Sequence, residues 1–138
     1  MLRILWLTTA LCLLFAAPAV AETPAYALVV NGMTVYSDVP LSVDGFRVLV
    51  PLRVVAEATG ANVQYLEQER EVIITRPGLV VVLKLDSYSF TKNGAAILLI
   101  TPPQLINDST FVTREQLVAI LDVNAYLNIP DHSFIVQG

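Results

Sequence analysis

The sequence predicts an α+β domain in which an antiparallel β-sheet twists around two short helices. Two short apolar stretches, at 51–60 and from Thr113 onward, carry the signals that begin and end helices. Asn-Gly pairs at 31–32 and 93–94 lie between apolar segments, which is typical of two-residue β-hairpins. These features recur at a constant offset of 62 residues. The offset indicates two pseudo-repeats, at about 25–76 and 87–138. Each repeat is expected to contain a β-hairpin, a strand, a helix and two further strands, in that order.

The first 21 residues have the pattern of a secretory signal peptide. Arg3 gives a positive start, an apolar run follows from Ile4 to Val20, and small residues precede a cleavage site at Ala21. The alternative is a retained membrane anchor, but no second hydrophobic span follows. We therefore expect cleavage after Ala21 and a secreted or extracytoplasmic protein, in the periplasm or cell envelope, without a membrane span.

Residues 22–138 are expected to form a single domain. Cys12 lies in the signal, so disulfides and thiolate sites are excluded from this part of the chain. Loss of Arg3 changes the net charge from −4 to −5, with seven Lys and Arg against twelve Asp and Glu. Such an acidic surface disfavours binding to nucleic acid.

The first unit opens with a hairpin and contains a punctuated helix. Residues 26–30 run into Asn31-Gly32 and return over 33–36. After a polar turn at Asp44-Gly45, a strand at 48–50 leads to the helix, and strands follow at 62–66 and 71–75.

Pro51 can begin a helix and Gly60 can end one in the left-handed conformation. Leu52 lies on the apolar stripe, while Arg53 and Glu57 are spaced i, i+4 and can pair.

An apolar segment, Gly78 to Leu85, separates the two units. It is short and β-branched, which favours a strand. Because both of its faces are apolar up to Lys84, we interpret it as a central strand buried on both sides. The alternative is an exposed edge strand, which would be an aggregation hazard.

The second unit repeats this order with a different helix start. Residues 88–91 run into Asn93-Gly94 and return over 95–100. After a polar turn at Asn107-Asp108, strands are expected at 110–112, 123–127 and 133–136. Thr113 and Gln116 predict a capping box in place of Pro51. Glu115 aligns with Arg53; the two either attract across the interface or are solvated separately.

Several of these residues carry a resemblance to a known family. Val30-Asn31-Gly32, Val50 to Arg53, Val55 to Ala58, and Gly60 to Val63 are similar to the repeating motif of the copper amine oxidase N-terminal-like domain. The resemblance implies an exported bacterial stalk-type module, with an antiparallel sheet twisted around helices. In the oxidases, copper and the quinone belong to a separate catalytic domain, which we expect this chain to lack. The second unit also lacks the Pro-Leu-Arg motif.

The residues offer little catalytic chemistry. His132 is the only histidine, and a metal site would need further nitrogen or sulfur ligands. Glu67, Glu69 and Glu71 alternate as expected of a solvated face, without calcium-loop spacing. We therefore expect no catalytic residues, no metal site and no cofactor.

These observations favour a non-catalytic exported structural or interaction module of the cell envelope. Its expected partner is an envelope protein or a cell-wall polysaccharide, with self-association through a sheet edge as a further contact. The alternative function is a small extracytoplasmic glycan- or peptidoglycan-binding protein, and an enzyme comes third. Exposed tyrosines aligned in a groove would favour the glycan-binding protein, whereas a bare sheet edge on a convex, charged surface would favour the interaction module. Six aromatic residues are candidates for such a binding face: Tyr26, Tyr36, Tyr65, Tyr88, Phe90 and Tyr126.

Overall fold

The computed structural model describes residues 25–138, so the expected signal peptide at 1–21 lies outside the described residues. The first half contains β1 (Ala27–Val30), β2 (Met33–Val35), β3 (Ser42–Asp44), β4 (Arg47–Pro51), α1 (Leu52–Ala58), β5 (Asn62–Leu66) and β6 (Glu71–Arg76). Next comes β7 (Leu79–Lys84). The second half contains β8 (Ser89–Lys92), β9 (Ala95–Leu98), β10 (Gln104–Ile106), β11 (Ser109–Thr113), α2 (Arg114–Leu121), β12 (Asn124–Asn128) and β13 (Ser133–Gln137). Two helices combined with β-sheets make this an α+β fold.

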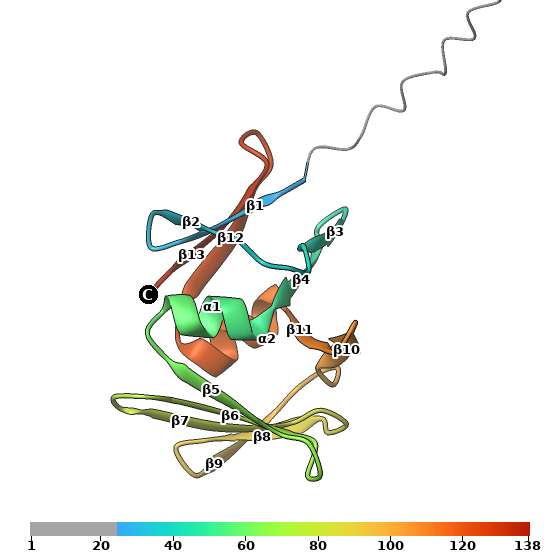
Figure 1. Cartoon of the computed structure of the whole chain (residues 1–138), viewed down its shortest axis with the longest axis vertical. Helices are drawn as coiled ribbons and strands as arrows, with labels where there is room; N and C mark the ends of the chain where they lie inside the picture. Colours follow the sequence, from blue (N-terminus) through green and yellow to red (C-terminus); the bar gives the residue numbers. More distant parts are fainter. Residues whose placement is uncertain (1–24) are drawn as a thin grey trace, which may run out of the picture.

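The strands form three sheets rather than the one sheet expected (Figure 1). Sheet A has the order β12-β13-β1-β2, sheet B the order β10-β11-β4-β3, and sheet C the order β5-β6-β7-β8-β9. Each sheet therefore joins strands from both halves of the chain. The strands pair antiparallel, as expected, except that β1 runs parallel to β13, with Ala27 opposite Ser133. The expectation of an entirely antiparallel sheet was therefore wrong at this one pair.

Sheet B contains two hairpins that the sequence did not reveal. The polar turns at Asp44-Gly45 and Asn107-Asp108 lie at the tips of β3–β4 and β10–β11. The two hairpins join where β4 pairs with β11, with Val50 opposite Val112. Because β3 and β10 have three residues each, they show too little alternation to be recognised from the sequence.

Corresponding elements of the two halves lie 62 residues apart. Ala27 begins β1 and Ser89 begins β8; Asn62 begins β5 and Asn124 begins β12. The strand β7 has no counterpart. It lies between β6 and β8 and pairs antiparallel with both, so β6 and β8 run parallel to each other. The corresponding strands of the other halves, β13 and β1, are also parallel, but they pair directly with no strand between them.

The strand β7 is central in sheet C, but it is buried on one face and not on both. Leu79, Val81 and Leu83 are buried, whereas Val80 is 49% exposed and Lys84 is exposed. Sheet C packs on the helices with one face, so alternate side chains of β7 point away from the core.

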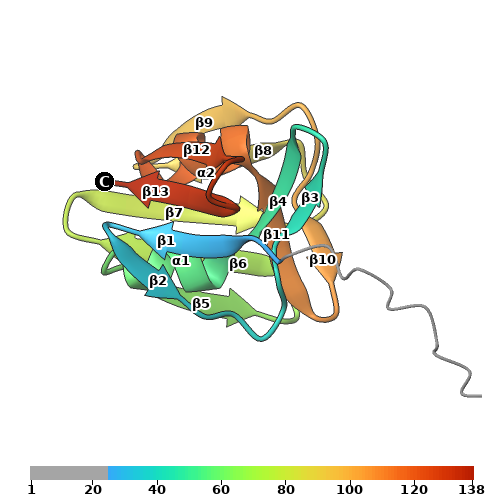
Figure 2. The same ribbon diagram turned by 90° about the horizontal axis from the view of Figure 1, so that it is seen from above.

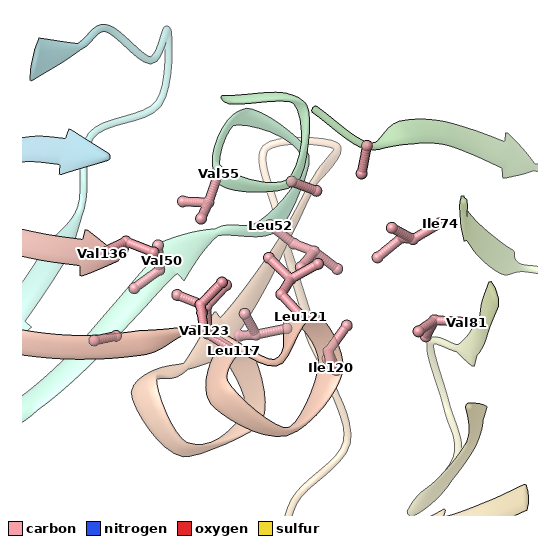
Figure 3. Close-up of a cluster of buried hydrophobic side chains, with 14 of the residues drawn as sticks. Val50, Leu52, Val55, Ile74, Val81, Leu117, Ile120, Leu121, Val123 and Val136 are labelled. Atoms are coloured by element: carbon pink, nitrogen blue, oxygen red, sulfur yellow. The ribbon is translucent and has the colours of Figure 1, made fainter. Parts of the chain in front are cut away.

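The core lies around the two helices, which are placed between sheets A and C (Figures 1 and 2). Figure 3 shows Leu52 of α1 and Leu117 and Ile120 of α2 among side chains from the surrounding strands. All three are fully buried. Burying a leucine or isoleucine side chain stabilises the fold by roughly 1.5–3 kcal/mol, so this cluster holds the sheets together.

Across residues 25–138, the structure contains no helix of the length and apolarity required to cross a membrane.

Candidate functional site

The Asn-Gly pairs form the tips of the β1–β2 and β8–β9 hairpins. Asn31 and Gly32 have φ values of 50° and 81°, and Asn93 and Gly94 have 51° and 84°. Positive φ at both central residues is the geometry of a type I′ turn, which matches the twist of the flanking strands.

The asparagine side chains also hold a neighbouring strand. Asn31 Nδ2 donates to the carbonyl of Gly138 at 3.1 Å, and its Oδ1 accepts the Gly138 amide at 3.0 Å. Asn93 accepts the Val80 amide at 2.8 Å and donates to the Gly78 carbonyl at 3.1 Å. Each turn therefore extends the pairing to the adjoining strand β13 or β7.

The residues around α1 have different roles. Pro51 ends β4 and is the N-cap, Leu52 is fully buried, and Gly60 follows the helix with a φ of +89°. Arg53 Nε lies 3.6 Å from Glu57 Oε1 on the exposed side, and its Nη2 donates to the Val63 carbonyl at 3.5 Å.

An arginine occupies the equivalent place at α2 although it is shifted by one position in the sequence. Arg114 aligns with Leu52, yet its Nε donates to the Ala125 carbonyl at 2.5 Å, and Ala125 aligns with Val63. The strands β5 and β12 are edge strands of sheets C and A, so both edges have a carbonyl covered by a guanidinium. Glu115 lies 3.5 Å from Arg114. The pairs Arg53–Glu57 and Arg114–Glu115 thus form within each helix, and Arg53 does not pair with Glu115.

An open groove of about 910 Å³ lies beside the start of α1. Four parts of the chain form it: the first turn of α1, the β5–β6 hairpin, the β10–β11 hairpin and the loop after β2. Its lining residues are Ser37, Asp38, Val39, Pro51, Leu52, Arg53, Val54, Val63, Tyr65, Glu67, Gln68, Arg70, Val72, Leu105, Asp108, Ser109 and Thr110. This groove brings the motif residues Pro51, Leu52 and Arg53 together with a set of polar side chains, and we take it as the candidate site.

The apolar residues that line the groove are mostly buried or half-buried, whereas its charged residues are exposed. Arg70 Nε contacts Asp86 Oδ2 at 2.7 Å; this hydrogen bond and the charge of Asp86 raise the pKa of the Arg70 guanidinium. Both lining arginines therefore have carboxylate partners from outside the groove. Among the described residues, no cation lies within 4.0 Å of the lining carboxylates Asp38, Glu67 and Asp108. The groove consequently presents net negative charge to a ligand.

The matching position in the second half is closed by the chain itself. Gln116 is 6% exposed, and its Nε2 donates to the carbonyl of Thr101 at 2.6 Å and to its hydroxyl at 3.2 Å. Sixty-two residues earlier, Val54 aligns with Gln116 and Val39 with Thr101, and both valines line the groove. Valine side chains form no such hydrogen bond, so the loop after β2 lacks the side-chain contact with α1 that Thr101 has with α2.

The candidate aromatic residues do not form a row. Tyr65, 40% exposed, is the one that lines the groove. Tyr36, Tyr88 and Tyr126 are exposed at other places, and Phe90 is buried. Tyr26 packs its ring against His132, with the ring centroids 5.2 Å apart.

Within residues 25–138, no three histidine, cysteine or acidic side chains come together as metal ligands. His132 lies in the β12–β13 turn with a φ of +47°. Glu71 contacts Lys84 at 3.7 Å, while Glu67 lies at the groove. That the protein binds no metal or cofactor stays a prediction.

Sequence patterns gave no sign of the groove lining. Tyr65, Val54 and Val39 belong to no recognised motif, and they meet only because of the tertiary fold. The available signal was the alignment of the halves, in which a buried Gln–Thr contact of one half is replaced by two valines in the other.

The chain matches a known protein family over most of its length. The model described as the copper amine oxidase N-terminal domain matches residues 29–134, which include both helices and at least part of every strand. No curated protein matches the chain.

Proposed function

Because the chain belongs to the copper amine oxidase N-terminal domain family, which is a non-catalytic module, we propose that it is an exported structural or interaction module of the cell envelope. The signal-like pattern of residues 1–21 supports export. The expected mature chain, 22–138, contains all the described elements.

The observation that carries this proposal is the groove beside α1. The groove is open in the first half of the chain. In the second half, the hydrogen bond between Gln116 and Thr101 occupies the equivalent place. The valine and leucine side chains of the groove lining suit an apolar anchor. Its three lining carboxylates, which form no ion pair within the described chain, suit basic side chains. We propose that the groove holds a segment of an envelope protein that carries both.

The test uses a variant that copies the closed half onto the open one. Val39→Thr combined with Val54→Gln should introduce the hydrogen bond that Gln116 forms with Thr101, and so close the groove. Pull-down from envelope extracts should recover one partner with the wild-type chain, and recovery should fall at least tenfold with the double variant. Thr91→Gln, at an exposed position outside the groove, is the matched control and should recover the partner as well as the wild type does.

Two outcomes would overturn this proposal. One is equal recovery by the double variant and the control. The other is a wild-type chain that captures no protein above the level of an uncoupled resin. Melting curves of all three chains show whether a loss of capture reflects the groove or unfolding.

A second candidate function is glycan or peptidoglycan binding. Tyr65 favours it, because an exposed ring beside hydroxyl, amide and carboxylate side chains is able to stack on a sugar while these groups bind its hydroxyls. Since this groove contains a single tyrosine, the protein partner remains the first proposal. Cosedimentation with purified cell-wall material separates the two: a glycan-binding protein would sediment with the wall, and Tyr65→Ala would abolish this.

We also infer that the two halves are copies of one unit. The constant spacing of corresponding elements and the identical Asn-Gly turns support this. On this view the groove arose where the two copies diverged.

A further inference from the structure

The edge strand β9 has an unusual composition for an exposed edge. It is the last strand of sheet C, and the chain from Ala95 to Ile100 contains only alanine, isoleucine and leucine. Leu98 is 83% exposed and Ile100 is 93% exposed. Such a strand offers apolar side chains and unpaired backbone groups on the same edge.

Hydrogen bonds with β8 show which backbone groups of β9 point outward. The Leu99 amide donates to the Tyr88 carbonyl at 2.5 Å, so the Leu99 backbone faces β8. Within a strand, backbone groups alternate between the two edges. The amides and carbonyls of Ala96 and Leu98 therefore point away from β8, toward the free edge.

Other outer strands of the described chain are protected, and β9 is not. An arginine covers a carbonyl on β5 and on β12. The strands β2 and β10 are each three residues long and are soon followed by Asp38 and Asp108, respectively. The strand β3 contains Asp44. Charges and short length are the usual means of preventing edge pairing. The chain around β9 has no charged residue between Lys92 and Asp108.

We propose that β9 is a self-association site, at which it pairs antiparallel with β9 of a second copy of this chain about a two-fold axis. Ala96 of each copy lies opposite Leu98 of the other, so their outward amides and carbonyls exchange hydrogen bonds. The two five-stranded sheets become one continuous sheet. This contact does not involve the groove and does not depend on the function proposed above.

Charge favours a second copy as the occupant of this edge. The whole chain has a net charge of −4, so most of its surfaces would repel the same surfaces of another copy. The uncharged stretch between Lys92 and Asp108 brings no like charges together across a two-fold axis. An antiparallel pair of one strand with itself is also self-complementary, as an isologous interface requires.

The same features limit the assembly to two copies. Pro102 and Pro103 follow the strand, and proline has no amide to continue a ladder. Pairing uses the free edge of β9 in both copies, and the other outer strands carry the protections described above. The assembly is therefore closed and does not grow into fibres.

Sedimentation equilibrium of the purified chain from 22 to 138 tests the proposal. The wild type should have twice the mass of one copy. Leu98→Lys should halve this mass, because each lysine would lie opposite Ala96 of an apolar strand and diagonally across the two-fold axis from the other lysine. Tyr36→Lys is the matched control: it aligns with Leu98, lies just after the other hairpin's edge strand β2, is 89% exposed, and should leave the dimer intact.

A second measurement reports the register. With Cys12 removed alongside the signal, the chain has no cysteine, so an Ala96→Cys chain mixed with a Leu98→Cys chain should form a disulfide-linked dimer under mild oxidation. Circular dichroism should show that each variant is folded. A monomeric wild type, a Leu98→Lys variant that keeps the dimer mass, or higher oligomers in the wild type would each overturn the proposal.

Discussion

Single residues at the turns determine how the strands are joined. Asn31 and Asn93 adopt positive φ, and their side chains bind the backbone of a strand in addition to their own hairpin. An aspartate could adopt the same backbone conformation, but it could not donate to the carbonyls of Gly138 and Gly78. Asparagine is therefore required at these turns for its amide as well as for its backbone.

Gly60 should tolerate no β-branched residue. Its φ is +89°, and a Cβ built there would meet no atom within 4 Å, so the expected penalty comes from the backbone alone. Gly60→Val should lower the free energy of unfolding by about 1–3 kcal/mol, measured by urea denaturation. Gly60→Asn is the control and should lose less free energy of unfolding than Gly60→Val, because asparagine adopts positive φ more readily than valine does. Equal midpoints for Gly60→Val and the wild type would contradict this account.

At the scale of elements, local signals identified the helices and the Asn-Gly hairpins. They did not identify β3 or β10, whose three residues become strands through pairing with β4 and β11. They also gave no reason to expect β1 beside β13, because more than a hundred residues separate Ala27 from Ser133. The prediction that β7 is buried on both faces was wrong for a similar reason. Val80 is as apolar as Val81, and only the layer arrangement leaves it exposed.

The start of α2 should depend on Gln116 more than on its exposed neighbour. Gln116 completes the capping box by accepting the Thr113 amide at 2.9 Å, and it donates to Thr101. Gln116→Val would remove these bonds and leave the Thr101 carbonyl without its donor, so stability should fall by about 1–3 kcal/mol.

Glu115→Val is the control for this comparison. The Glu115 side chain is 72% exposed and contacts Arg114 at 3.5 Å, so the free energy of unfolding should change by no more than about 0.5 kcal/mol. Hydrogen exchange should also quicken in the segment around Thr101 in the Gln116 variant alone. Similar losses of stability in both variants would show that the contact with Thr101 contributes little.

For the whole molecule, the candidate site is a product of the tertiary fold. Its lining comes from four separate segments, and none carries a catalytic or ligand-binding pattern. The sequence did contain the relevant difference, since Val54 and Val39 stand where the other half has Gln116 and Thr101. The meaning of that difference depends on the distance between α2 and the loop before β10, which only the structure provides.

The exchange of strands between halves predicts that neither half folds alone. A cut at Pro77 would separate β1–β2 from β12–β13 in sheet A, β4 from β11 in sheet B, and β6 from β7 in sheet C. Each fragment would expose the apolar edges and faces that the other covers, and about 50–60 cysteine-free residues form only a marginal core. We expect fragments 22–76 and 78–138 to be unfolded or aggregated separately, as seen by amide NMR spectra, and the intact chain to unfold in one transition by calorimetry. Mixing the fragments should restore a dispersed spectrum, because the three sheets can then re-form between them. A dispersed, native-like spectrum from either fragment alone would mean that the halves are independent modules.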